Sequence, residues 1–212
     1  SPDADPWNPE SLNKPGGQGH IPIFNALLDN ETFWATYINR WADLSNTHFS
    51  CENMHAVLDS MVLVLDPEME RHTERWGGNY AGWMENVEET HDFITERCEE
   101  TLISGIEDCY DVESVTLTIL INGLGEVQVN SVDIGPPDVP MEAVYFSGVP
   151  MQLDAEEDLG ELFLFWEVLE GDINLVNPTN PSLGFTLSGD ATIVAYFAAS
   201  AEPQELVFIV DP

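Results

Sequence analysis

The sequence predicts an α+β protein, with an all-helical amino-terminal segment followed by a small β-rich domain of sandwich or grasp-like architecture. Up to about residue 110, apolar residues recur every three or four positions, as on one face of a helix. Beyond that point they fall into short runs rich in β-branched and aromatic residues, separated by Gly, Pro, Asn and Asp, which is typical of strands. We therefore expect a helical segment at 1–110, a β-rich domain at 111–200 and a terminal strand at 201–212.

Four helices are predicted in the first segment. Asn30 stands where a capping residue is needed, just before the run ETFWATYINRWADLSN. The pair Asp66-Pro67 is predicted to end one helix and begin the next, because aspartate caps helices and proline is tolerated in a first turn. Gly77-Gly78 is predicted to end the third helix. The predicted helices cover about residues 31–46, 51–65, 66–76 and 81–104.

Six strands are predicted after residue 110, and a seventh candidate lies at the end of the chain. The six are the runs VTLTILIN, EVQVNS, AVYF, ELFLFWEVL, GFTLS and TIVAYF. The final candidate repeats the pattern of residues 117–123 and consists of Leu206, Val207, Phe208, Ile209 and Val210. Two roles stay open for it. It adds to a sheet of a neighbouring copy as an assembly strand, or it completes the sheet of its own domain.

The charge of the chain restricts its partners. It carries 39 Asp and Glu against five Lys and Arg, for a net charge of -34, and residues 111–212 contain no Lys, Arg or His. Such a surface repels phosphates and anionic lipids, so nucleic acid is excluded as a partner. No apolar run is long enough for a membrane span, so membrane insertion is excluded as well. We expect a secreted protein kept soluble in salty water, with a dedicated calcium-binding role as the alternative.

Calcium is the one cofactor that the sequence suggests. Asp154, Glu156 and Asp158 alternate in a stretch predicted to be a loop, and carboxylate oxygens are the ligands that calcium prefers. An EF-hand is excluded, because Phe165 stands where the bidentate glutamate is required. The three carboxylates therefore form either a solvated loop or a weak calcium site.

The three cysteines suggest one disulfide. Cys98 and Cys109 lie close together around the predicted end of a helix, so we expect them to pair and leave Cys51 as a buried thiol. No CxxC pair is present, so zinc is not predicted. The sequon at Asn30 predicts N-glycosylation if the protein leaves the cytoplasm.

The segment RHTERWGGNYAGW, residues 71–83, holds two of the five basic residues and one of five histidines. A catalytic interpretation would use His72 as an acid or base, but general acid–base catalysis needs a second positioned group, and the spacing suggests none. We therefore predict no catalytic residue. Instead the two arginines are expected to pair with nearby acids above packed tryptophans, through Arg71, Arg75, Glu68, Glu74, Glu85, Trp76 and Trp83.

An ordered series of motifs in the first half resembles the carboxy-terminal portion of the CotH kinase family, which are secreted or spore-coat relatives of protein kinases. The series is PGGQGH, NALLDNETFWATYINRWADLSNT, PEMERHTERW and GWMENVEETHDFITER, over about residues 12–110. In that family the nucleotide-binding lysine and the metal-binding aspartates lie upstream of this region. The resemblance therefore assigns no catalytic residue to this chain.

The second half resembles a divergent internalin-type bacterial repeat. The matching elements are NGLGEVQVN, YFSGVP, LFLFWE, VNPTNP and DATIVAYF, over about residues 115–198. This resemblance implies a spacer or adhesive module of a secreted surface protein.

Together these interpretations predict a non-catalytic part of a secreted bacterial surface protein, acting in structural assembly or adhesion. The expected partners are further copies of the chain or another surface protein, at the cell surface or outside the cell. The alternative is the carboxy-terminal lobe of an atypical, CotH-like protein kinase whose catalytic residues lie upstream.

Overall fold

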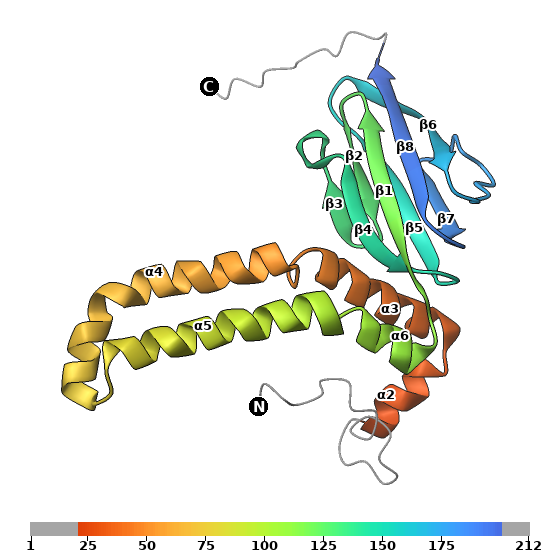
Figure 1. Cartoon of the computed structure of the whole chain (residues 1–212). Coiled ribbons are helices and arrows are strands. Elements are labelled where there is room, and N and C mark those ends of the chain that lie inside the picture. Colours follow the sequence, from red (N-terminus) through yellow and green to blue (C-terminus); the bar gives the residue numbers. More distant parts are fainter. Residues whose placement is uncertain (1–20, 201–212) are drawn as a thin grey trace, which may run out of the picture. The chain divides into compact units, whose positions relative to one another are not determined.

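The computed structural model describes residues 21–200, which form two compact units (Figure 1). The helical unit contains residues 21–34 and 41–112, and the β-rich unit contains residues 35–40 and 113–200. A helical region followed by a β-rich region confirms the predicted α+β class. No helix within the described residues is both long enough and apolar enough to cross a membrane.

Helix boundaries in the first region follow from side-chain caps. Asn30 accepts a hydrogen bond from the backbone N–H of Phe33, as predicted, and Ser50 and Asn79 cap the two long helices in the same way. Each cap satisfies a backbone donor that has no partner within its helix. The helices are α2 (Ile21–Leu28), α3 (Glu31–Asn46), α4 (Cys51–Trp76), α5 (Tyr80–Glu96) and α6 (Ser104–Tyr110), and a π-helical turn, η1 (Arg97–Thr101), joins the last two.

The predicted helix end at Asp66-Pro67 is wrong, because α4 continues through Pro67 to Trp76. Proline lacks the N–H of an interior helical residue, and its ring crowds the carbonyl four residues earlier, which bends a helix. Figure 1 shows α4 changing direction between its orange and yellow parts. Pro67 therefore does interrupt the regular helix, but it produces a bend within one helix and not a boundary between two. Gly77, with a φ of 89°, then ends α4.

The β-rich unit contains two sheets of four strands within the described residues. Their order is β4-β1-β8-β6 in one sheet and β3-β2-β5-β7 in the other. All pairs are antiparallel except β1 and β8, which run parallel in the middle of the first sheet. The strands are β1 (Ser114–Asn122), β2 (Gly125–Val129), β3 (Val132–Ile134), β4 (Met141–Phe146), β5 (Pro150–Glu157), β6 (Glu161–Glu170), β7 (Ser182–Thr186) and β8 (Ala191–Ala199).

Alternating side chains from both sheets form the core of the β-rich unit. Leu117 and Ile119 of β1 are fully buried, as are Val127 of β2 and Leu153 of β5. This period of two is expected when each sheet buries one face. Within the same unit, Asn39 from the 35–40 segment donates a hydrogen bond to the carbonyl of Pro150 over 2.7 Å. Of the two predicted architectures, the pair of sheets corresponds to the sandwich.

Two strands were missed by the sequence interpretation. The short strand β3 lies outside the six predicted runs, and β5 contains Asp154, which was predicted to lie in a loop. The alternation of Met151 and Leu153, both buried, is the signal that could have identified β5. The predicted terminal strand, residues 206–210, lies outside the described residues.

Close approach of the two sheets depends on Gly125. A Cβ atom at this position would lie 2.4 Å from Cε1 of Phe197, although strand β2 contributes Gly125 to one sheet and β8 contributes Phe197 to the other. No ordinary Cβ contact is that short, so the Phe197 ring occupies the space that a side chain would need. Glycine at this position therefore permits the sheets to pack.

We predict that Gly125→Ala lowers the unfolding free energy of the β-rich unit by about 1–3 kcal/mol, the usual effect of overpacking a core. Urea denaturation followed by tryptophan fluorescence measures this value. The matched control is Gly184→Ala, in strand β7, where the nearest atom to an added Cβ is 3.7 Å away. The control should stay within about 0.5 kcal/mol of the wild type. Equal losses in both variants would contradict the packing argument.

Candidate functional site

The long helices α4 and α5 form a hairpin that is distinguished by how little it buries. They lie side by side (Figure 1), yet no residue of either helix reaches full burial. Large apolar side chains are exposed on α4, including Val57, Met61 and Val64. Burial of apolar surface is the main source of helix–helix stability in water. The hairpin must therefore be held together largely by specific links.

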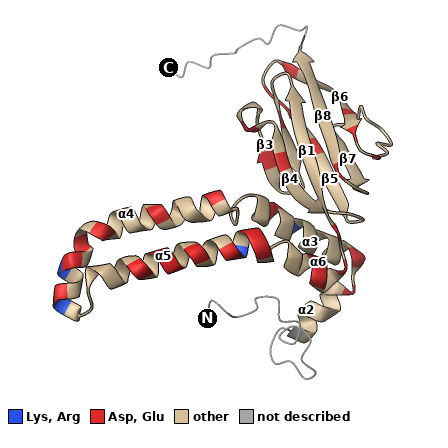
Figure 2. Cartoon of the chain, in the orientation of Figure 1, with Lys and Arg blue, Asp and Glu red and all other residues tan. Residues whose placement is uncertain are grey.

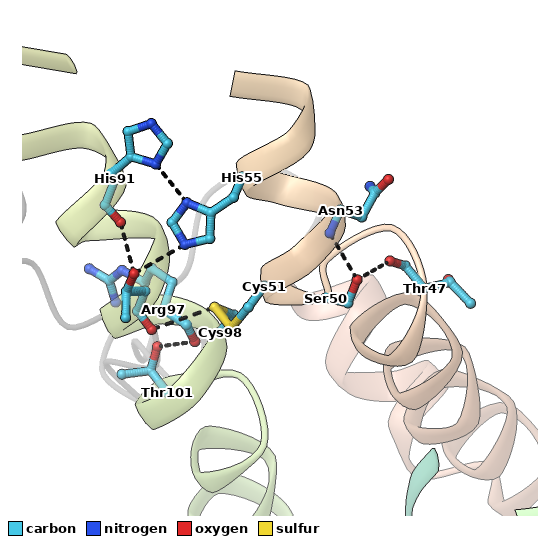
Figure 3. Close-up of a disulfide and its surroundings, with 10 residues drawn as sticks. Thr47, Ser50, Cys51, Asn53, His55, His91, Arg97, Cys98 and Thr101 are labelled. Atoms are coloured by element: carbon cyan, nitrogen blue, oxygen red, sulfur yellow. Dashed lines mark hydrogen bonds between the residues drawn. A yellow bond between two sulfur atoms is a disulfide. The ribbon is translucent and has the colours of Figure 1, made fainter. Parts of the chain in front are cut away.

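A disulfide between Cys51 and Cys98 closes the base of the hairpin (Figure 3). Cys51 begins α4 and Cys98 follows the end of α5, with 5.3 Å between their Cα atoms. The predicted Cys98–Cys109 pair is therefore wrong, and Cys109 lies outside the disulfide, on α6. The prediction used closeness in sequence, whereas two antiparallel helices bring residues 47 positions apart into contact.

A chain of four polar side chains crosses the hairpin next to the disulfide. The Nδ1 atoms of His55 and His91 lie 2.7 Å apart. On the far side of each ring, Nε2 of His91 lies 3.1 Å from Asp59, and Nε2 of His55 lies 3.1 Å from the hydroxyl of Thr95. Figure 3 shows the two rings meeting between the helices. This chain links α4 to α5 by hydrogen bonds, one helical turn above Cys51.

The histidine pair restricts the number of protons that it can hold. With both rings neutral, His91 donates from Nε2 to Asp59, His55 donates from Nδ1 to His91, and Thr95 donates its hydroxyl proton to His55. One added proton is accommodated, because the Thr95 hydroxyl also lies 3.1 Å from the carbonyl of His91 and can donate there instead. A second added proton places two N–H groups against each other over 2.7 Å. The link therefore breaks when both rings are charged.

A further link lies at the bend of α4. The Tyr80 hydroxyl, at the start of α5, donates a hydrogen bond to the carboxylate of Asp66, just before Pro67. This hydrogen bond raises the pKa of the Tyr80 phenol above its ordinary value, because it favours the protonated form, and desolvation and the Asp66 charge act in the same direction. The base of the hairpin is thus held by a disulfide and a histidine pair, whereas the part near its tip is held by the hydrogen bond between Tyr80 and Asp66.

The basic segment of residues 71–83 has a structural arrangement. Arg71 pairs with Glu68 over 3.2 Å, as predicted, with both side chains exposed. Arg75 lies over the ring of Trp76, and Trp83 lies beside Tyr80. The predicted burial of Trp76 is wrong, since 70% of this residue is exposed. An isolated exposed ion pair of this kind contributes little to stability.

The three predicted calcium ligands are not brought together. Asp154 and Glu156 lie on strand β5, opposite Gln128 and Glu126 of β2, and the predicted loop there is wrong. Asp158 follows in the turn, and its carboxylate accepts a hydrogen bond from the backbone N–H of Leu159. Among residues 21–200, no three His, Cys, Asp or Glu side chains are placed to hold one metal ion.

Asn30 is exposed, and its side-chain oxygen accepts the cap hydrogen bond of α3 from Phe33. Glycosylation at this residue stays a prediction.

The pairing of His55 with His91 was not predicted from the sequence. Its signal is spacing, because His55 follows Cys51 by four residues and His91 precedes Cys98 by seven, which places each histidine on the cysteine face of its helix.

Residues 7–100 match the family model described as CotH kinase protein. The match covers somewhat less than half of the chain and includes the whole α4–α5 hairpin with its disulfide. No curated protein and no solved structure matches the chain. The resemblance of the first half to the CotH kinase family is thus supported. The resemblance of residues 115–198 to an internalin-type repeat stays a prediction.

We predict that Cys51→Ser destabilises the CotH-matched hairpin by about 4 kcal/mol, the chain-entropy value for a loop of this length. Loss of helical circular dichroism in urea measures the effect, with Cys109→Ser as the control that leaves the disulfide intact. Peptide mapping without reduction should recover a fragment joining Cys51 to Cys98. Recovery of Cys98 joined to Cys109 would contradict the structure.

The hydrogen-bonded link predicts that removal of one ring weakens the hairpin. The His55 ring contacts both His91 and Thr95. His55→Ala should therefore lower the helical unfolding free energy by about 1–2 kcal/mol. Urea denaturation followed by helical circular dichroism measures this value.

His72→Ala is the control, because His72 is an exposed histidine of the same helix. The control should stay within about 0.5 kcal/mol of the wild type. Equal losses in both variants would show that the pair does not act as a link.

Proposed function

We propose that this chain is a non-catalytic part of a secreted bacterial surface protein, acting in structural assembly or adhesion. The match to the CotH kinase family supports an association with the spore coat or cell surface. The Cys51–Cys98 disulfide supports an oxidising environment outside the cytoplasm, where structural disulfides persist. A strongly negative surface is suited to salty extracellular fluid, where screening shortens the range of self-repulsion.

An edge strand of the first sheet carries the assembly part of this proposal. That sheet ends in strands β4 and β6. Strand β6 is an unsuitable acceptor, because the carbonyl of Pro178 takes the N–H of Trp166 and the carboxylate of Glu157 takes that of Phe163. Two register shifts also interrupt β6, and bulges of this kind protect an edge. Strand β4 is a regular edge strand of six residues paired with β1.

In this proposal residues 206–210 of one copy add to β4 of the next. The donor sequence LVFIV is apolar and β-branched, which suits strand addition, and no charge lies within it. Because both copies are acidic, association should strengthen as salt screens their repulsion. Strand exchange between copies would produce fibres or rings of this chain.

A truncation separates assembly from simple completion of the fold. The full chain should form larger species in about 1 M NaCl than in about 0.05 M NaCl, measured by light scattering after gel filtration. A chain lacking residues 206–212 should stay monomeric at both concentrations and keep its melting temperature. Unfolding of the truncated chain would overturn the proposal in favour of a strand that completes its own sheet.

A donor peptide provides an independent readout. The synthetic peptide ELVFIVDP, which reproduces residues 205–212, should bind the truncated chain and raise its melting temperature. The control peptide replaces the phenylalanine by lysine and should bind more weakly. Equal binding of both peptides, or binding of neither, would count against strand addition.

The alternative function is the carboxy-terminal lobe of an atypical, CotH-like kinase. The observation that favours it is the family match itself, which names a kinase. Neither function predicts nucleotide binding by these 212 residues, because the family's nucleotide-binding lysine and metal-binding aspartates lie upstream of the region that the motifs match. The intact mass of the protein isolated from its source separates the two functions. A mass near the 23.6 kDa of this sequence would support the non-catalytic proposal. A much larger protein whose melting temperature rises with ATP and Mg²⁺ together, but not with either alone, would favour the kinase.

A further inference from the structure

An apolar groove runs along one side of the α4–α5 hairpin. It has a volume of about 330 Å³ and is lined mainly by Phe49, Val57, Leu58 and Met61, with Ile94 from the facing helix. Val57 and Met61 lie four residues apart, on one face of α4. Their exposed fractions are 44% and 57%, and that of Val64, which continues the same face, is 74%. The groove and this apolar face form one continuous strip along α4.

The shape and spacing of this strip suit a helix. Apolar residues three and four apart on α4 present the ridges against which a further helix packs, and two adjacent helices create the groove between those ridges. The strip lies on a hairpin whose two helices bury no residue completely. A third helix would cover Val57 and Met61, as in a small helical bundle.

The negative charge of the hairpin indicates which kind of helix can bind in the groove. Between residues 51 and 96 there are eleven Asp and Glu against two Arg, and every one of these acids is exposed. Figure 2 shows the acids in red bands along both helices. A second copy of the hairpin would bring the same negative charge against these bands, whereas a helix with Lys and Arg beside its apolar face would be attracted by them.

We propose that the groove of the α4–α5 hairpin binds a basic amphipathic helix of another protein. Its apolar side chains enter the space lined by Phe49, Val57 and Met61, and its flanking cations meet the acids of the two helices. The Cys51–Cys98 disulfide and the His55–His91 pair hold the groove open in a defined shape. Neither the terminal strand nor the edge of the β-rich unit takes part in this interaction.

The experiment measures binding of a defined probe to the full chain. The probe is a fluorescent peptide of about 16 residues built from leucine and lysine in an amphipathic helical pattern, a length that gives a stable helix on binding. A peptide of the same composition in scrambled order controls for simple charge attraction. We expect the amphipathic peptide to bind at least tenfold more tightly than the scrambled peptide, in fluorescence anisotropy at physiological salt. Equal affinities would overturn the proposal.

Two substitutions on the same helix locate the binding surface. Met61→Glu places a charge in the groove and should raise the Kd of the amphipathic peptide at least tenfold, as expected for a central contact. Leu63→Glu adds the same charge to an apolar residue of α4 that is 77% exposed and does not line the groove. Leu63→Glu should change the Kd less than threefold. Circular dichroism verifies that both variants stay folded.

The remaining outcomes identify a different occupant. If Met61→Glu and Leu63→Glu weaken binding equally, the peptide is held by charge alone and the groove is not its site. If sedimentation shows a dimer that Met61→Glu dissociates, a second copy covers the groove. If deletion of residues 201–212 strengthens peptide binding at least tenfold, this chain's own terminus covers it. Each of these results would overturn the proposal.

Discussion

The covalent link between Cys51 and Cys98 is the constraint on which the helical hairpin depends. Helices α4 and α5 bury no residue completely, so apolar contact alone holds them weakly. The disulfide fixes the register at the base, and that register brings His55 opposite His91. The Tyr80–Asp66 hydrogen bond then closes the far end. Without the link at the base, the polar contacts would have to overcome the entropy of ordering two long exposed helices.

The charge of the chain explains why the two units are stabilised differently. The hairpin has little apolar burial to set against the mutual repulsion of its exposed acids, so it relies on covalent and hydrogen-bonded links. The β-rich unit is also acidic, and its residues from 113 onward include no cation, but two buried sheet faces supply a core. Its carboxylates, such as Glu126 and Glu156 on paired strands, remain exposed, where water screens their repulsion.

Local signals in the sequence were reliable, and long-range relationships were not. Asn30 predicted the start of α3, because a cap acts within a few residues. Pro67 was predicted to begin a new helix, because the sequence pattern alone does not distinguish a bend within a helix from its end. The disulfide was assigned wrongly, since pairing depends on the antiparallel packing of two helices and not on sequence distance. Strand β5 was missed because its second half, rich in carboxylates, has the composition of a loop, and only Met151 and Leu153 carry the period of two that marks a buried face.

The two proposed interactions differ in how they relate to the family match. The groove of the hairpin lies within the residues that match the CotH kinase family, whereas the edge strand β4 and residues 206–210 lie outside them. An interaction through the groove would therefore be shared by relatives that retain the hairpin and its disulfide. An interaction through β4 would be restricted to chains that join this β-rich unit to a CotH-matched region. The two surfaces lie on different elements, so either interaction can fail without affecting the other. Salt also affects them in opposite directions. Screening weakens the attraction between the acidic hairpin and a cationic helix, but it strengthens the association of two acidic copies.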